Sequence, residues 1–87
     1  MPLFYIYDMY YVYVLKCNDG DFYKGCTSDL RKRYNKHIHG WVPATAAKRP
    51  LELVFYCAFK NKYQAINFEK NLKSESGIAF MQKRLVK

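Results

Sequence analysis

The turn at residues 18–20 (NDG) is the feature that most limits how this chain can fold. It separates two runs rich in aromatic and β-branched residues, MYYVYVLK (9–16) and DFYKGC (21–26). Such runs on either side of an Asn/Asp/Gly cluster are typical of a β-hairpin. A three-residue loop would place the Tyr13 and Tyr23 hydroxyls on one face of the sheet, whereas a two-residue loop would separate them. Glycine in the left-handed position of a three-residue loop favours the first option.

The remaining segments predict two further layers of structure around this hairpin. The expected elements are a helix of about ten residues between a cap at 27–29 and Gly40, a loop over 40–50, a strand over 51–59, a helix over 62–73 capped by Asn61 and Gln64, and a short helix over 76–85. The strand LELVFYCAF (51–59) shows no alternation, which predicts burial on both faces at the centre of the sheet.

The order β-β-α-β-α-α defines one small α/β (α+β) domain, because 87 residues leave no room for a second. We expect the domain to span residues 10–87. Residues 1–9 would form an N-terminal arm or an extra edge strand.

The positive charge of the chain is concentrated after the hairpin. Residues 1–29 carry two Lys/Arg and four Asp/Glu, net −2, whereas residues 30–87 carry thirteen and three, net +10. Clustered Lys and Arg favour a polyanionic partner, since they release counterions from a phosphate backbone. An ordinary solvated surface explains the charge equally well.

The three cysteines are odd in number and show no CxxC spacing, and two of them lie in apolar strand-like runs. This favours structural thiols in a reducing compartment over disulfides or metal ligands. The first eight residues lack the pattern of a signal peptide, and no apolar run reaches membrane-spanning length. We therefore expect a cytoplasmic protein without a membrane contact.

Two charged side chains fall on helix faces that should be apolar. On the first helix, Arg33 and His37 lie beside the stripe formed by Leu30, Tyr34 and Ile38. His37 could act as a general base, contact phosphate, or simply pack at an edge.

On the second helix, Glu69 projects beside the stripe of Ala65, Phe68 and Leu72. A carboxylate there is partly desolvated unless a partner pairs with it. An ion pair between Arg33 and Glu69 would explain both charges without a site, but two helices that each aim one charge at the sheet favour a site.

These residues belong to an ordered set of short motifs. The set comprises Tyr11-Val12-Tyr13, Tyr23-Lys24-Gly25-x-Thr27, Arg33-x-x-x-His37, Gly40, Thr45, Arg49-Pro50 and Ala65-x-x-x-Glu69-x-x-x-Lys73. In order and spacing it resembles the GIY-YIG nuclease family, most closely its small stand-alone (UPF0213-like) members, over residues 10–85. Each piece alone is weakly specific, and the ordered set is specific.

The resemblance implies a three-stranded antiparallel sheet flanked by three helices and a divalent-metal-dependent endonuclease. The partner would be DNA, in repair or processing, with RNA as the alternative, and the cofactor one Mg²⁺ (or Mn²⁺) ion. Glu69 would hold the ion, Arg33 would steady the phosphate, and Tyr13 and Tyr23 would activate or position water. His37 matches a frequent but less uniform position of the family.

Further nucleic-acid contacts are expected from one glycine and six cations: Lys24, Gly25, Lys32, Lys36, Lys48, Arg49 and Lys73. Gly25 would let the substrate backbone approach, because it lacks a side chain. Lys24 replaces an isoleucine of the family motif, so it either contacts phosphate or turns from the core toward solvent. Tyr11 replaces the first motif glycine, and no asparagine follows Asn71.

Two other classes of function stay open on the sequence alone. One is a nucleic-acid-binding module of the same fold that does not cleave, which would gain nothing from Glu69. The other is a basic structural protein of a ribonucleoprotein particle that uses charge and exposed aromatic residues such as Trp41. The sequence does not determine the oligomeric state, and a homodimer could form through the tyrosine-rich arm.

Overall fold

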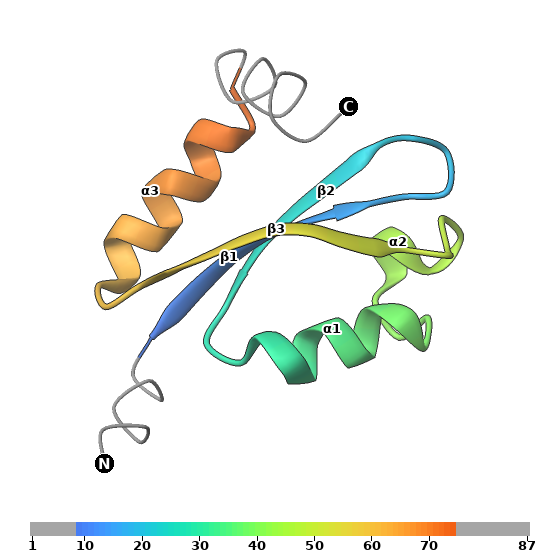
Figure 1. The fold of residues 1–87 in the computed structure, drawn as a ribbon, viewed down its shortest axis with the longest axis horizontal. Helices are drawn as coiled ribbons and strands as arrows, with labels where there is room; N and C mark the ends of the chain where they lie inside the picture. The colour runs from blue at the N-terminus through green and yellow to red at the C-terminus, as the bar shows by residue number, and fades with distance from the viewer. Residues whose placement is uncertain (1–8, 75–87) are drawn as a thin grey trace.

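The strand that carries Tyr13 is the centre of the sheet. The structure, a computed structural model, describes residues 9–74. Its elements are β1 (Tyr10–Lys16), β2 (Phe22–Thr27), α1 (Leu30–Ile38), α2 (Pro43–Ala46), β3 (Glu52–Phe59) and α3 (Lys62–Leu72). The strands form an antiparallel sheet in the order β2-β1-β3, with α3 on one face and α1 on the other (Figure 1). This confirms the expected three-stranded antiparallel sheet flanked by helices.

Two terminal predictions cannot be compared with this arrangement. The N-terminal arm, apart from Met9, and the third helix at 76–85 lie outside the described residues. Within residues 9–74, no helix is long and apolar enough to cross a membrane.

The prediction that residues 51–59 form the central strand is wrong, because β3 is an edge strand. In β1, four successive residues from Val12 to Leu15 are at most 2% exposed. In β3, by contrast, Tyr56 is 56% exposed and Ala58 is also exposed, while the alternate residues pack toward α3. Both runs are apolar in sequence, and only the pairing order distinguishes the strand that is covered on both faces.

The hairpin has the predicted three-residue loop. The Cys17 amide donates to the Asp21 carbonyl at 2.8 Å, and Gly20 takes a φ of +90°, which favours glycine. The resulting register pairs Tyr13 with Gly25 and Leu15 with Tyr23. Since directly paired residues share a face, Tyr13 and Tyr23 lie on the same side of the sheet, as expected.

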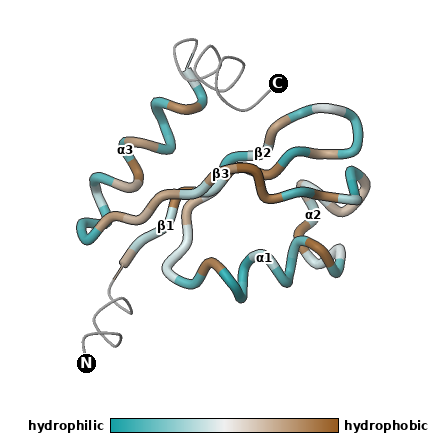
Figure 2. Tube along the Cα trace, viewed as in Figure 1, coloured by the Kyte–Doolittle hydropathy of each residue, from teal (hydrophilic) through white to brown (hydrophobic). Residues whose placement is uncertain are grey.

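Both faces of the sheet are covered, but by different kinds of packing. Val12 and Val14 pack with Ala65 and Leu72 of α3 in the apolar core. The opposite face meets α1, which is coloured as hydrophilic along most of its length in Figure 2. One described residue of α1 is buried, and it is His37. The expected apolar stripe of α1 is therefore wrong at its end, where Ile38 is 41% exposed.

Each end of α1 is stabilised by a local motif. Asp29 is the N-cap, and its side chain accepts from the Lys32 amide at 3.0 Å. At the other end Gly40 takes a φ of +78°, and its amide and that of Trp41 donate to the carbonyls of His37 and Lys36. This pair of bonds is a Schellman motif, which fixes the path of the chain as it leaves the helix.

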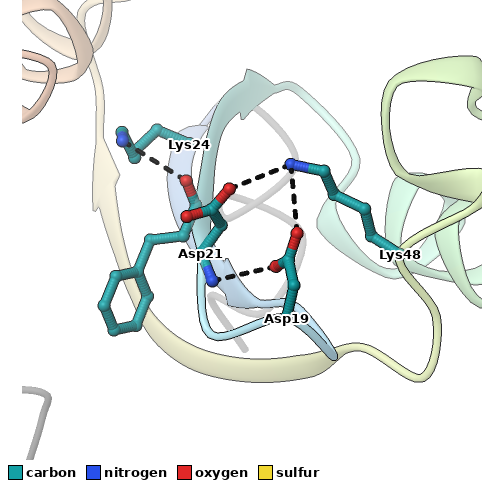
Figure 3. Close-up of polar contacts among 5 residues, drawn as sticks. Asp19, Asp21, Lys24 and Lys48 are labelled. Carbon is teal, nitrogen blue, oxygen red and sulfur yellow. Dashed lines mark hydrogen bonds and ion pairs between the residues drawn. The ribbon is translucent and has the colours of Figure 1, made fainter.

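The segment expected to be a loop contains the one-turn helix α2, and it is tied to the hairpin. Lys48 pairs with Asp21 at 3.2 Å and with Asp19 at 3.7 Å (Figure 3), and its carbonyl accepts from the Asn18 amide at 2.9 Å. The side-chain pairs raise the pKa of Lys48. These contacts hold the segment that follows α2 against the β1–β2 turn.

Asn61→Ala should lower the free energy of unfolding by about 1 kcal/mol. The Asn61 side chain caps α3 by accepting from the amides of Tyr63 (2.7 Å) and Gln64 (3.2 Å), and alanine would leave both amides without that acceptor. Urea unfolding of the full chain measures the change. Asn67→Ala, at an exposed position inside α3, is the matched control and should be neutral or slightly stabilising. Equal destabilisation by both variants would contradict the capping role.

Candidate active site

A buried hydrogen-bonded chain of three side chains links β1, α1 and α2. The Tyr13 hydroxyl lies 2.9 Å from His37 Nε2, and His37 Nδ1 lies 2.8 Å from Thr45 Oγ1. Tyr13 is 2% exposed, and His37 and Thr45 are fully buried. Both ring nitrogens of His37 are therefore satisfied, and the ring cannot rotate without breaking a bond.

The hydrogens of these three groups can be arranged in two ways, and each leaves one hydroxyl hydrogen without an acceptor among the described residues. We expect the fully buried Thr45 to donate to His37 Nδ1, because the unused hydrogen then belongs to Tyr13, which keeps 2% exposure. His37 Nε2–H then donates to the Tyr13 oxygen, and the Tyr13 hydrogen is free to point at a further acceptor. Hydrogen bonds are then donated from Thr45 to His37 and from His37 to Tyr13.

Gly25 makes room for the Tyr13 ring. A β-carbon at Gly25 would lie 2.4 Å from both Cζ and Oη of Tyr13. The ring therefore crosses from the central strand onto β2, an edge strand, and carries its hydroxyl there. The expectation that Gly25 admits the substrate backbone is replaced by this role, because the tyrosine occupies the space.

Tyr23 completes an aromatic cluster around His37. Its ring centroid lies 5.2 Å from that of His37 and 6.4 Å from that of Tyr13, and the Tyr13 and His37 centroids are 5.6 Å apart. The two His37 contacts are edge-on, a favourable geometry for aromatic pairs. Three of the predicted site residues are thus in direct contact.

The charges of Arg33 and Glu69 both act on the Tyr13 hydroxyl. Burial raises the pKa of Tyr13 above its ordinary value of 10.0; Tyr23 and Glu69 add to this, while Arg33 opposes it. Burial, and after it the charge of Arg33, lowers the pKa of His37 below 6.5. At pH 7 both groups are consequently neutral, so Tyr13 is a hydroxyl and His37 carries one ring proton.

Arg33 lies at the edge of a depression in the surface. This depression has a volume of about 330 Å³ and is lined by Thr27, Ser28, Asp29, Lys32, Arg33 and Lys36. Within residues 9–74 the Arg33 side chain makes no hydrogen bond or ion pair, and it is half-buried. Its guanidinium is available to a ligand, and two further cations stand beside it.

Glu69 approaches from the other face of the sheet. It lies on α3, its side chain is 20% exposed, and it pairs with Lys73 at 3.2 Å. Among the described residues, Arg33 and Glu69 therefore do not form the ion pair that would have explained both charges without a site. Burial, and after it the charge of Glu69, raises the pKa of Cys26 on β2, and Glu69 also adds to the raised pKa of Tyr13, so its charge acts at that edge of the sheet.

Other predicted contacts lie away from this cluster. Lys24 shares the face of Val14, opposite to Tyr13, and its ammonium donates to the Phe22 carbonyl at 3.3 Å (Figure 3). Arg49 donates to the Ala46 carbonyl at 2.9 Å, so it supports the backbone after α2. With Lys48 held by the hairpin, these three cations have structural partners. Lys32 and Lys36 are the predicted contacts that remain beside Arg33.

Thr45 is the site residue to which sequence reasoning gave no role. Its segment reads as a loop, where a buried hydroxyl is not expected. The signal lies in Pro43, which begins α2 at the position that tolerates proline and turns Thr45 inward.

The residues present fit a largely hydrated hard cation better than a zinc ion. Among the described residues no three His, Cys, Asp or Glu side chains lie together, as a closed zinc site requires. Mg²⁺ uses one or two carboxylates and keeps several waters, so the partly exposed Glu69 carboxylate suffices for it.

Comparison with known proteins gives consistent matches. A family described as the GIY-YIG catalytic domain matches residues 9–83. The UPF0213 protein SSP2268 of Staphylococcus saprophyticus is 37% identical over 70 residues, 79% of this chain and 85% of that protein. A UPF0213 protein of Bacillus pumilus is 42% identical over 66 residues, 75% of this chain and 67% of that protein.

A solved structure matches as well. The solution NMR structure of the UPF0213 protein BH0048 from Bacillus halodurans has a TM-score of 0.57 and 32% identity, covering 90% of this chain and 87% of that one. The sequence match to the family spans every site residue described above, from Tyr13 to Glu69.

Proposed function

Because this chain belongs to the family of the GIY-YIG catalytic domain, we propose that it is a divalent-metal-dependent endonuclease that hydrolyses phosphodiester bonds in DNA. The observation that carries the proposal is the environment of Tyr13. Its buried hydroxyl is bonded to a neutral histidine and lies within the influence of one cation, Arg33, and one carboxylate, Glu69. A site for cleaving a phosphodiester needs these elements: a group that positions water, a positive charge for the phosphate and a ligand for a metal.

Each side chain has a distinct task in this proposal. The Tyr13 hydrogen, left free by the bond from His37, would orient the attacking water at the edge of β2, and Tyr23 would confine it from the side. Arg33 would place its guanidinium on the phosphate and stabilise the charge that develops on the oxygens. Glu69 would hold Mg²⁺ or Mn²⁺, which when bound polarises a phosphate oxygen and lowers the pKa of coordinated water.

Glu69→Gln and Arg33→Ala should each reduce cleavage by at least about 100-fold, the scale on which a lost charge of this kind acts. The assay uses the purified chain with Mg²⁺ or Mn²⁺ on supercoiled DNA, on branched and flapped DNA oligonucleotides, and on RNA. Lys70→Gln and Arg31→Ala are matched controls, because they remove an exposed charge from the same two helices. Circular dichroism verifies that the variants fold.

Cutting at the wild-type rate by either site variant would contradict the proposed active site. The second candidate, a binding module that does not cut, is favoured by one observation, the ion pair that Lys73 makes with Glu69. Tight, salt-dependent binding of every substrate without cutting under either metal would establish it. Preferential cutting of RNA would correct the substrate and leave the site intact.

A further inference from the structure

Trp41 presents an indole ring to solvent in a fixed position. It is 68% exposed, and it stacks on the His39 ring with centroids 4.7 Å apart and planes inclined by 22°. The His39 ring is itself held, because its Nδ1 lies 2.7 Å from the Asn35 carbonyl. The backbone is fixed from the other side by the bond from the Trp41 amide to the Lys36 carbonyl. The exposed aromatic ring is therefore backed by a second ring and held in place.

The stretch of sequence around this ring is rich in cations. Residues 30–51 contain six Lys or Arg and no Asp or Glu, and Trp41 lies near the middle of this stretch. The Arg49 guanidinium lies over Gly40, the residue between the two stacked rings, within 3 Å of where a β-carbon would be. Lys36 lines the depression beside Arg33, one helical turn before Gly40. An aromatic ring among cations matches a nucleic acid strand, whose bases stack on the ring while its phosphates meet the charges.

We propose that the outer face of Trp41 is a stacking site for one nucleobase of an unpaired nucleotide. In a duplex both faces of an internal base are covered by its neighbours, so only a base in a single strand, flap, bulge or frayed end can occupy such a face. This inference rests on the proposed function, which makes nucleic acid the ligand. It adds the substrate class, which is strands with unpaired nucleotides near the bond that is cut. The same helix, α1, carries Arg33 and His37 toward the active site and leads into Trp41.

The test exploits the fact that Trp41 is the one tryptophan in the chain. The full-length protein is titrated without divalent metal, so that binding is measured in the absence of cutting. The ligands are a mixed-sequence single-stranded DNA oligonucleotide and a blunt duplex of the same sequence. Intrinsic fluorescence reports stacking on Trp41, and anisotropy of a labelled oligonucleotide reports total binding. We expect saturable quenching by the single strand and little by the duplex.

Trp41→Ala should weaken single-strand binding by about 5- to 150-fold, the range for loss of one stacked base, and should affect duplex binding much less. Trp41→Phe should restore a large part of the affinity. The matched control is Tyr63→Ala, which removes an aromatic ring that is 73% exposed on α3, and it should bind like wild type.

Single-strand binding without quenching, or equal affinity of Trp41→Ala and wild type, would overturn the inference. Failure of the proposed nuclease function is distinguishable from this result. A protein that is quenched by single strands but never cuts keeps the stacking site and loses the nuclease proposal. A protein that cuts DNA but whose tryptophan fluorescence is not quenched keeps the nuclease proposal and loses the stacking site.

Discussion

Gly25→Ala is expected to lower the free energy of unfolding by about 1–3 kcal/mol, the range for overpacking a filled interior. The new β-carbon would lie 2.4 Å from Cζ and Oη of Tyr13, a separation that real contacts do not reach. The Tyr13 ring cannot retreat freely, because it is buried and bonded to His37 at 2.9 Å. Any shift that relieves the clash therefore moves the hydroxyl out of its place in the site.

A double-mutant cycle separates this clash from other effects of the substitution. In a Tyr13→Leu background the atoms that meet the new β-carbon are gone, so Gly25→Ala should become nearly neutral. Urea unfolding gives the four free energies, and DNA cleavage by the Gly25→Ala protein gives the effect on the site. Equal destabilisation with and without the tyrosine would show that the glycine serves some other purpose. If the Gly25→Ala protein is too unstable to measure, folding of the Tyr13→Leu/Gly25→Ala protein still shows the coupling.

Thr45→Val is expected to destabilise the fold by about 1–3 kcal/mol and to change the protonation pattern of His37. Valine has nearly the shape of threonine, but it leaves the buried His37 Nδ1 without a partner. In the wild-type protein we expect Thr45 to donate to Nδ1 and the proton of the neutral ring therefore to be on Nε2. In the variant the preference for that tautomer should weaken, and Tyr13 should lose a fixed partner.

Nitrogen-15 NMR of the histidine side chains measures the tautomer directly, without any assay of activity. Thr45→Ser keeps the hydroxyl and should restore the wild-type spectrum, with a smaller cost from the lost methyl group. A proton on Nδ1 in the wild-type protein, or an unchanged spectrum in Thr45→Val, would contradict donation from Thr45 to His37 and from His37 to Tyr13. If Thr45→Ser loses as much stability as Thr45→Val, the role of Thr45 is packing and not hydrogen bonding.

The features that sequence reasoning predicted correctly are local ones. The hairpin register followed from a three-residue turn, and the start of α3 from the capping asparagine, since each depends on residues a few positions apart. The faces of β1 and β2 came with the register, which is why Tyr13 and Tyr23 were expected together.

What escaped prediction depends on contacts between distant segments. The order of strands decides whether an apolar run is central or at an edge, and no pattern within LELVFYCAF encodes that order. On α1 the sequence favours Ile38 as the buried residue, yet His37 is buried instead, because Tyr13 and Thr45 satisfy both of its nitrogens. A polar side chain of this kind enters the interior only when its partners come from elsewhere in the chain.

The central position of β1 also determines which motions can reach the site. Its backbone is bonded to a strand on each side, so its amides should exchange with solvent only through the largest opening of the fold. The backbone around Tyr13 should therefore open only when the whole domain unfolds. Trp41 lies outside the sheet, just after α1, so its backbone is not bonded to a strand on each side and should exchange through smaller openings. The proposed stacking site and the proposed reaction site thus lie in parts of one small domain that differ in local stability.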